Sequence, residues 1–189
     1  MADNHMNVIR YHLADRLIVL VGMMASGKTS VGRLLARRLQ LPFVDADHEI
    51  EAAAQMSIPE VFAKHGEEYF RSGERRVIAR LLGEGPRVLA TGGGAFMCPE
   101  TRDLIRQRGI SIWLKADAQT LFRRAKRRSN RPLLQTKDPE ATIREMMEIR
   151  YPVYAKADVS IESKDGTYDE TVDSVIAGLL AFVEKGQQP

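Results

Sequence analysis

The segment at residues 22–29, GMMASGKT, limits the possible folds more than any other part of the chain. It fits G-x-x-x-x-G-K-[ST], the pattern of a loop that binds phosphate. An apolar run at residues 17–21 precedes it and predicts a buried parallel strand. Apolar residues then recur at helical spacing between Val31 and Leu39, with arginines on the opposite face. The alternative to a phosphate-binding loop is a glycine turn with a lysine nearby by chance. The strand before the motif and the helix after it argue against that alternative.

Each residue type in this loop has a physical reason. Glycines let the backbone turn so that successive N–H groups point at phosphate oxygens. The helix that follows directs its N-terminal dipole at the same anion. Lys28 is expected to reach the β- and γ-phosphates, and the Thr29 hydroxyl to bind Mg²⁺. The residues expected to contact ATP are Gly22, Met23, Met24, Ala25, Ser26, Gly27, Lys28, Thr29 and Ser30.

The length of 189 residues suits one α/β domain with a substantial core. The formal net charge of +3 permits an anionic ligand without requiring nucleic acid. The single cysteine, Cys98, cannot form an intrachain disulfide, and the longest apolar run, residues 17–25, is too short to cross a bilayer. We therefore expect a soluble cytoplasmic protein that binds neither membrane nor nucleic acid. The expected organisation is a loosely ordered leader at 1–16, one domain at 17–185 and a tail at 186–189.

Strand-like and helix-like patterns alternate along the chain. This alternation predicts a three-layer α/β fold, in which a parallel sheet is covered by helices on both faces. We expect a five-stranded sheet with the strand order 2-3-1-4-5. The expected strands lie at residues 17–21, 43–45, 87–91, 110–114 and 158–161.

Several residues mark expected helix boundaries. Asp47 is expected to cap the helix after the second strand. Ser57 begins a capping-box sequence, for a short helix that should end near Gly66 before a longer one starts. Pro152 should end the helix over residues 139–151. These signals divide the regions between the strands into separate helices.

Polar residues and glycines follow the strands at the edge where an open α/β sheet binds ligands. Asp45 and Asp47 follow the second strand and could hold hydrated Mg²⁺ and accept a proton from a hydroxyl. Their structural alternative is a helix cap beside a solvated aspartate. The triple glycine at residues 92–94 follows the third strand and could present N–H groups to an anion, or be a flexible loop. The phosphate-binding loop nearby favours the functional interpretation of both segments.

Two basic features could serve an anionic substrate. Arg71 lies three residues before Glu74, either in an ordinary ion pair or as a guanidinium that Glu74 orients toward a substrate carboxylate. The basic run at residues 123–128 and Arg131 could contact nucleic acid, form a solvated helix face or belong to a lid over ATP. No aromatic residues are interleaved with this run. Beside a phosphate-binding loop, a mobile lid over about residues 124–138 is the favoured interpretation.

The motifs GMMASGKT, DADHEIE, FRSGE, TGGGA and RPLL, followed by Arg150-Tyr151, occur in this order over residues 17–180. In this combination the chain resembles the shikimate kinases, within the nucleoside-monophosphate-kinase-like group of P-loop proteins. The resemblance implies ATP-dependent phosphorylation of the shikimate 3-hydroxyl, in the biosynthesis of chorismate and the aromatic amino acids. One departure is the loop at residues 163–168, which lacks the proline that family members often have in the adenine loop.

The resemblance also implies roles for residues around the acceptor substrate. Asp47 would bind the shikimate hydroxyls and act as the catalytic base. Arg71 and Arg150 would bind the shikimate carboxylate from two distant parts of the chain. Gly93 and Gly94 would line the same pocket.

On the nucleotide side, the resemblance implies that Lys28 and Thr29 serve ATP and Mg²⁺. Asp45 would contact the metal through water. Arg131, in the lid, would contact the phosphates, and Arg124 would lie against adenine. Catalysis would then depend on Lys28 and Arg131 together with the aspartate base.

Two other functions are open alternatives. A gluconate-type or nucleotide kinase of the same fold would share the loop and the lid, but would not need Arg71 and Arg150 to converge on one carboxylate. A nucleotide-binding regulator or nucleic-acid-binding protein would use the basic run, but would leave Asp47 and the triple glycine without a role. The favoured partners are shikimate and ATP, bound by a monomer whose substrate-binding region spans about residues 45–82.

Overall fold

The structure is a computed structural model, and it describes residues 2–126, 138–164 and 166–185. Its centre is a five-stranded parallel sheet with the strand order β2-β3-β1-β4-β5, which confirms the predicted order. The strands are β1 (Leu17–Val21), β2 (Phe43–Asp45), β3 (Val88–Ala90), β4 (Gly109–Lys115) and β5 (Val159–Glu162). Strand β1 lies in the middle, where Ile18 pairs with Val88 on one side and with Ile110 on the other.

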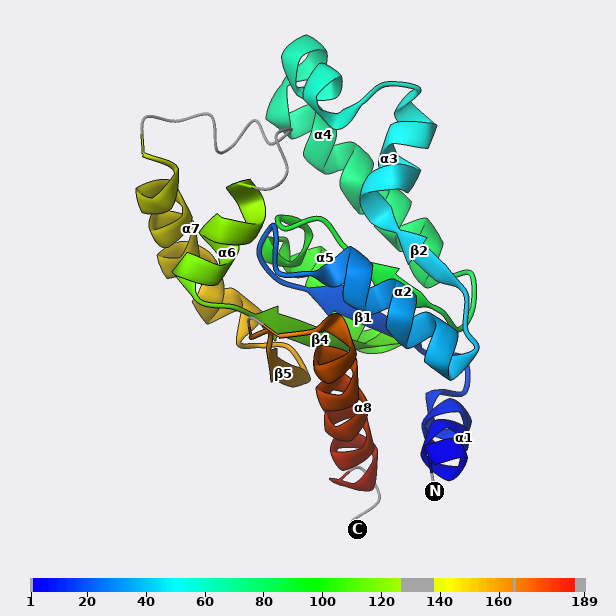
Figure 1. The fold of residues 1–189 in the computed structure, drawn as a ribbon. Helices are drawn as coiled ribbons and strands as arrows, with labels where there is room; N and C mark the ends of the chain where they lie inside the picture. Colours follow the sequence, from blue (N-terminus) through cyan, green and yellow to red (C-terminus); the bar gives the residue numbers. More distant parts are fainter. Residues whose placement is uncertain (1, 127–137, 165, 186–189) are drawn as a thin grey trace.

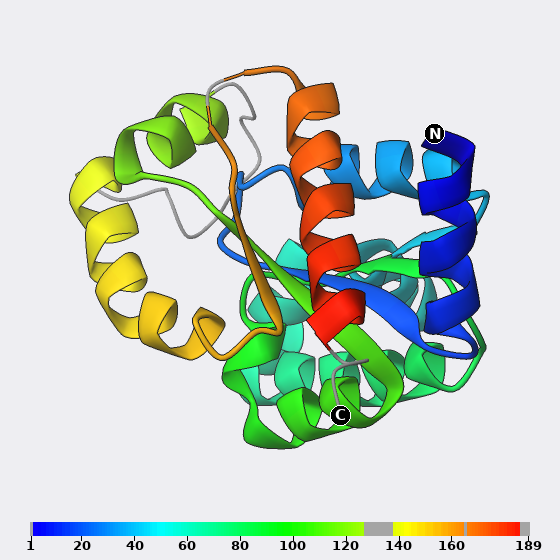
Figure 2. The same cartoon turned by 90° about the horizontal axis from the view of Figure 1, so that it is seen from below.

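Helices cover both faces of the sheet and complete the three predicted layers (Figures 1 and 2). One face packs against α1 (Ala2–Leu13), α2 (Lys28–Leu39) and α8 (Tyr168–Lys185). The other packs against α3 (Ala46–Ala54), α4 (Ile58–Leu82), the 3₁₀ helix η1 (Ala95–Met97), α5 (Pro99–Arg108), α6 (Ala118–Lys126) and α7 (Pro139–Tyr154). No helix in the described ranges is both long enough and apolar enough to span a membrane.

Strand β1 shows how a continuous apolar run builds two cores. Successive side chains of a strand point to opposite faces of the sheet. Leu17, Val19 and Val21 therefore join the core beneath α3 to α7, while Ile18 and Leu20 join the core beneath α1, α2 and α8. All five side chains are fully buried, which explains why none of them is polar.

The first residues of the chain differ from the loosely ordered leader that the sequence predicts. They form α1, and the side chains of Ile9 and Leu13 are buried in the core shared with α2 and α8. Met6 packs at the edge of the same core, so the three residues make an apolar stripe at helical spacing. Arg10 also donates to the side-chain oxygen of Gln40 at 2.7 Å. This stripe between polar residues was overlooked because it is only three residues long.

Two of the expected helix boundaries within α4 are confirmed, whereas the one expected in α7 is wrong. Ser57 forms the predicted capping box, and Gly66, with φ of +81°, kinks α4 where a break was expected. Pro152 does not end α7, which continues to Tyr154. A proline removes one helical N–H, but here the hydroxyls of Tyr151 and Tyr154 donate to carbonyl oxygens outside the helix. These tertiary contacts hold the helical turn around the proline.

Candidate active site

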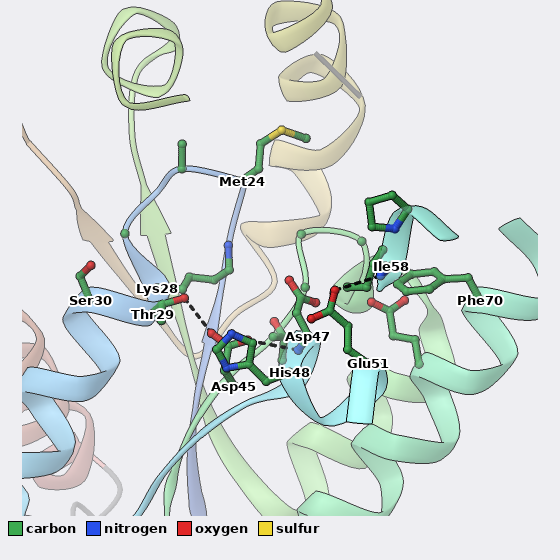
Figure 3. Close-up of a pocket in the computed structure, with 18 of the residues that line it drawn as sticks. Met24, Lys28, Thr29, Ser30, Asp45, Asp47, His48, Glu51, Ile58 and Phe70 are labelled. Atoms are coloured by element: carbon green, nitrogen blue, oxygen red, sulfur yellow. Dashed lines mark hydrogen bonds between the residues drawn. The ribbon is translucent and has the colours of Figure 1, made fainter. Parts of the chain in front are cut away.

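A cavity of about 610 Å³ opens at the carboxyl edge of the sheet, where open α/β sheets bind ligands (Figure 3). It brings together most of the predicted site residues. Those that line it are Met24, Ala25, Gly27, Lys28, Thr29, Ser30, Asp45, Asp47, Arg71, Gly93, Gly94, Arg124 and Arg150. Gly22, Met23 and Ser26 do not line it, and the side chains of Met23 and Ser26 are buried. Arg131 and most of the expected lid lie outside the described residues.

The phosphate-binding loop has the backbone conformation that its glycines allow. Gly22 and Gly27 have φ of +138° and +99°, which favour glycine over any other residue. A Cβ on Gly22 would also lie 2.8 Å from the carbonyl oxygen of Leu114. Lys28 begins α2, and its Nζ donates to the carbonyl oxygens of Gly22 and Met23, each at 2.8 Å. The ammonium group is therefore held at the loop beside a helix N-terminus, where an anion is favoured.

Asp45 links this loop to the second strand. The hydroxyl of Thr29 donates to Asp45 Oδ2 at 2.8 Å, and the backbone N–H of Asp47 donates to Asp45 Oδ1 at 3.1 Å (Figure 3). Asp45 is thus the N-cap of α3, and the prediction that Asp47 caps this helix is wrong. Because α3 starts one residue after Asp45, the cap needs nothing from the Asp47 carboxylate, which lines the cavity instead.

The Asp47 carboxyl is electrostatically unusual. Burial raises its pKa above the ordinary value, and the negative charge of Asp45 raises this pKa further. The nearby ammonium group of Lys28 acts in the opposite direction without cancelling the shift. A carboxylate with a raised pKa is a better proton acceptor than an exposed one. Asp47 therefore lines the cavity with a carboxylate that binds a proton more readily than an exposed one.

The first glycine of the triple glycine leaves space for two carboxylates close to the backbone. A Cβ on Gly92 would lie 2.8 Å from Asp47 Oδ1 and 2.9 Å from Glu74 Oε1. Glu74 is 3% exposed, and burial raises its pKa although Arg71 opposes the shift. Within the described part of the chain, Glu74 Oε1 has no hydrogen-bond partner. Any side chain at position 92 would displace these two acidic groups, which explains the first glycine.

The other two glycines of the triple glycine lie close to two guanidinium groups. A Cβ on Gly94 would lie 2.3 Å from Arg71 Nη1, which also donates to Glu74 Oε2 at 2.8 Å. Arg150 Nη1 donates to the carbonyl oxygen of Gly93 at 3.4 Å. Arg71 comes from α4 and Arg150 from α7, yet both line the same cavity. The structure therefore brings the two predicted carboxylate ligands together at the glycines, as the sequence resemblance implies.

Arg124 from α6 and Tyr168 from α8 also line the cavity. Arg124 donates to Ser163 Oγ at 2.9 Å and to the carbonyl oxygen of Lys164 at 2.6 Å. Its guanidinium lies 6.0 Å from the centroid of the Tyr168 ring. A Cβ on Gly27 would lie 3.2 Å from that ring, so the tyrosine packs on the phosphate-binding loop. The Arg124 guanidinium and the Tyr168 ring are therefore two planar groups that line the cavity beside the loop at residues 163–168, the loop that lacks a proline.

Sequence reasoning missed the apolar wall of the cavity. Ile58, Pro59, Phe62 and Phe70 line it from the two sides of the kink in α4, and the Phe62 and Phe70 rings lie 4.6 Å apart. At helical spacing such residues look like ordinary core positions, and only the break expected at Gly66 was a signal that they could face a cavity. Glu74 and Gly92, which the sequence analysis also considered for the site, line the cavity as well. Further lining residues outside the prediction are Arg33, His48, Glu51, Thr91 and Tyr168.

Together, the fold and the cavity define a class of protein, the P-loop kinases of small molecules. A phosphate-binding loop, a carboxylate facing the cavity and a polar pocket beside them are the parts that such an enzyme requires. A family model described as shikimate kinase matches residues 24–180, which is most of the chain. The chain belongs to the shikimate kinase family.

Individual relatives agree with this assignment. The chain is 58% identical to a shikimate kinase of Rhodopseudomonas palustris, over 90% of this chain and 84% of that protein. It is 57% identical to one of Bradyrhizobium diazoefficiens, over 94% of this chain and 86% of that protein. A solved structure of shikimate kinase from Acinetobacter baumannii in complex with shikimate has a TM-score of 0.86 and 36% identity, covering 96% of this chain and 99% of that one.

Proposed function

We propose that this chain transfers the γ-phosphoryl group of ATP to the 3-hydroxyl of shikimate and releases shikimate 3-phosphate and ADP. The observation that carries the proposal is the meeting of Arg71 and Arg150 at the triple glycine, in one cavity with Lys28 and Asp47. Guanidinium groups bind carboxylates through paired, charge-assisted hydrogen bonds. An acidic acceptor is therefore favoured, and membership of the shikimate kinase family supports shikimate as that acceptor.

The apolar wall fits a cyclic acceptor. Shikimate is a cyclohexene carboxylic acid, so its ring has apolar C–H groups that Phe62 and Phe70 can cover. Gluconate is also an acid, but it is an open-chain polyol without such a face. The wall therefore favours shikimate over gluconate, which two arginines alone would not do.

Asp47 is the residue we assign to the acceptor hydroxyl. Its carboxylate lines the cavity, and burial raises its pKa, which makes it a better proton acceptor than an exposed carboxylate. Phosphoryl transfer is largely dissociative, so Asp47 contributes more by orienting the hydroxyl than by removing its proton early. Glu74 keeps Arg71 in place beside it through the 2.8 Å hydrogen bond.

The nucleotide would lie along the phosphate-binding loop, with Lys28 at its terminal phosphates. The residues fit Mg²⁺, because the hydroxyl of Thr29 and the carboxylate of Asp45 offer adjacent hard oxygens at the helix N-terminus. Mg²⁺ takes one or two such protein ligands beside phosphate oxygens and water. When bound, it neutralises negative charge on the transferring group. Arg124 is assigned to adenine, and Arg131 is still predicted to contact the phosphates.

We also infer that the enzyme works in the cytoplasm as a monomer. The cytoplasm supplies ATP, and there the lone Cys98 would stay reduced. Specific activity that does not change with protein concentration is the result expected of a monomer.

A coupled assay of ADP release tests the proposal directly. It compares shikimate, gluconate and nucleoside monophosphates as acceptors at equal ATP and Mg²⁺ concentrations. We expect turnover with shikimate to exceed that with each other acceptor by at least about a hundredfold, because a wrong acceptor leaves polar groups of the site unpaired or its apolar wall uncovered. Faster turnover with gluconate or a nucleotide would assign the other kinase function. ATP binding without stimulation by any acceptor would favour a nucleotide-binding regulator.

A further inference from the structure

Tyr154, in the last turn of α7, is fully buried behind the triple glycine. Its hydroxyl donates to the carbonyl oxygen of Gly93. Arg150, one turn earlier on the same helix, donates to the same oxygen from Nη1 at 3.4 Å. Two side chains of α7 therefore hold one carbonyl group of the glycine loop.

Packing fixes the Tyr154 ring independently of this hydrogen bond. The ring centroid lies 6.0 Å from that of Trp113 and 6.5 Å from that of Phe96. Trp113 in turn lies against the phosphate-binding loop, since its Cδ1 is 3.3 Å from the position of a Cβ on Gly22. Packing in the core thus fixes the position of the Tyr154 hydroxyl, and the hydrogen bond from this hydroxyl holds the carbonyl group of Gly93.

The direction of the Gly93 carbonyl group determines that of the next N–H. In a planar trans peptide, the C=O of one residue and the N–H of the following residue point in opposite directions, and the described peptide bonds are trans. Gly93 and Gly94 line the cavity, whereas Tyr154 lies behind them and does not. The N–H of Gly94 is therefore directed away from the Tyr154 hydroxyl, and Gly94 itself lines the cavity. A peptide between two glycines turns over readily unless something holds it.

We propose that Tyr154 is a positioning residue for the acceptor, because its hydroxyl holds the Gly93–Gly94 peptide so that the Gly94 N–H and Arg150 face the substrate carboxylate together. This inference rests on the proposed function, since it requires an acidic acceptor. Burial raises the pKa of Tyr154 to about 12, although Arg150 opposes the shift. The phenol therefore stays protonated at neutral pH and keeps its donor.

The test compares two tyrosines of the same helix. Tyr154→Phe removes the hydroxyl at Gly93 and keeps the ring, while Tyr151→Phe removes a hydroxyl that donates to the carbonyl oxygen of Ala116 instead. For Tyr154→Phe we expect KM for shikimate to rise about three- to tenfold, the usual effect of one hydrogen bond. Its kcat and its KM for ATP should stay within about twofold, because the contact is equally strong in ground and transition states. Tyr151→Phe should leave all three constants unchanged within the same margin.

A second readout separates positioning from a merely structural role. The carboxamide of shikimate has the same ring without the negative charge. The preference for shikimate over this amide, as a ratio of kcat/KM values, should fall about two- to fivefold in Tyr154→Phe and stay constant in Tyr151→Phe. A structural role would lower the melting temperature of both variants and leave the ratio constant. Equal ratios in the wild type and both variants would overturn the inference.

A third measurement uses the wild-type chain, so it does not depend on how well a variant folds. In protein labelled with ¹⁵N-glycine, the Gly94 amide resonance should shift when shikimate is added and shift less with the carboxamide. An unmoved Gly94 resonance at saturating shikimate contradicts the inference. The proposed function fails separately, if the wild type does not phosphorylate shikimate at all. If the wild type is active but Tyr154→Phe matches Tyr151→Phe, only the positioning role is lost.

Discussion

Adding one methyl group to the glycine loop should disable acceptor binding while leaving the fold intact. In Gly94→Ala, the new Cβ would lie 2.3 Å from Arg71 Nη1, whereas ordinary contacts begin at 3.4 Å, so the guanidinium must retreat by about 1 Å. Arg71 is the mobile end of a long side chain, and Gly94 has φ of −94°, which alanine tolerates. The backbone strain of the substitution should therefore be small. The retreat, however, breaks the 2.8 Å hydrogen bond to Glu74 and moves the guanidinium away from the carboxylate pocket.

Loss of a hydrogen bond to a charged group costs about 1.5–3 kcal/mol. Shikimate affinity should accordingly fall by roughly ten- to a hundredfold, with KM for ATP within about twofold of wild type. Steady-state kinetics and equilibrium titration of shikimate measure the effect, and thermal melting checks the fold. Gly73→Ala is the matched control, because a Cβ there meets no atom within 4 Å. It should keep wild-type kinetics and add up to about 1 kcal/mol of helix stability. Wild-type shikimate affinity in Gly94→Ala would refute the reasoning.

Two further predictions concern charged groups of the same cavity. Lys28→Ala should lower kcat by a factor of about 10²–10³ in steady-state assays while the protein stays folded, because one preorganised contact to the transferring phosphoryl group is lost. Retention of half the wild-type turnover would reject the proposed contact of Lys28 with the phosphates. Burial raises the folded-state pKa of Glu74, so its contribution to stability is present below the ordinary pKa of 4.5 and is lost as pH rises through the raised pKa. Urea unfolding across this window should show wild type losing stability relative to Glu74→Gln, and parallel curves would contradict the assigned burial effect.

Most of the fold could be predicted because its main signals are local. The apolar run of β1 and the glycines of the phosphate-binding loop each allow few conformations, and the alternation of elements predicts a parallel sheet with helices on both faces. The failures occurred where tertiary contacts decide the outcome. Helix α1 depends on Ile9 and Leu13 reaching a core built by distant elements. The passage of α7 through Pro152 depends on hydroxyl groups bonded outside the helix.

The site was predictable to a similar extent and for a related reason. The rule that ligands bind beyond the carboxyl ends of parallel strands predicts one location for Asp45, Asp47 and the triple glycine from the sequence alone. It could not show that Gly94 is the contact point of Arg71, since this proximity exists only in three dimensions. Tyr154 was missed as well, because a buried aromatic residue in a helix has the same pattern as any core residue.

The most direct measurement is single-turnover phosphoryl transfer by Asp47→Asn and wild type, with ATP and shikimate both saturating. Asparagine keeps the size of the side chain and can bond a hydroxyl, but it cannot accept the proton. The transfer rate should fall by about 10²–10⁴, the usual contribution of a positioned general base. Saturation removes effects on binding, so the rate reports the chemical step alone. Transfer by Asp47→Asn at the wild-type rate would contradict the account, because Asp47 would then not be the base that accepts the proton.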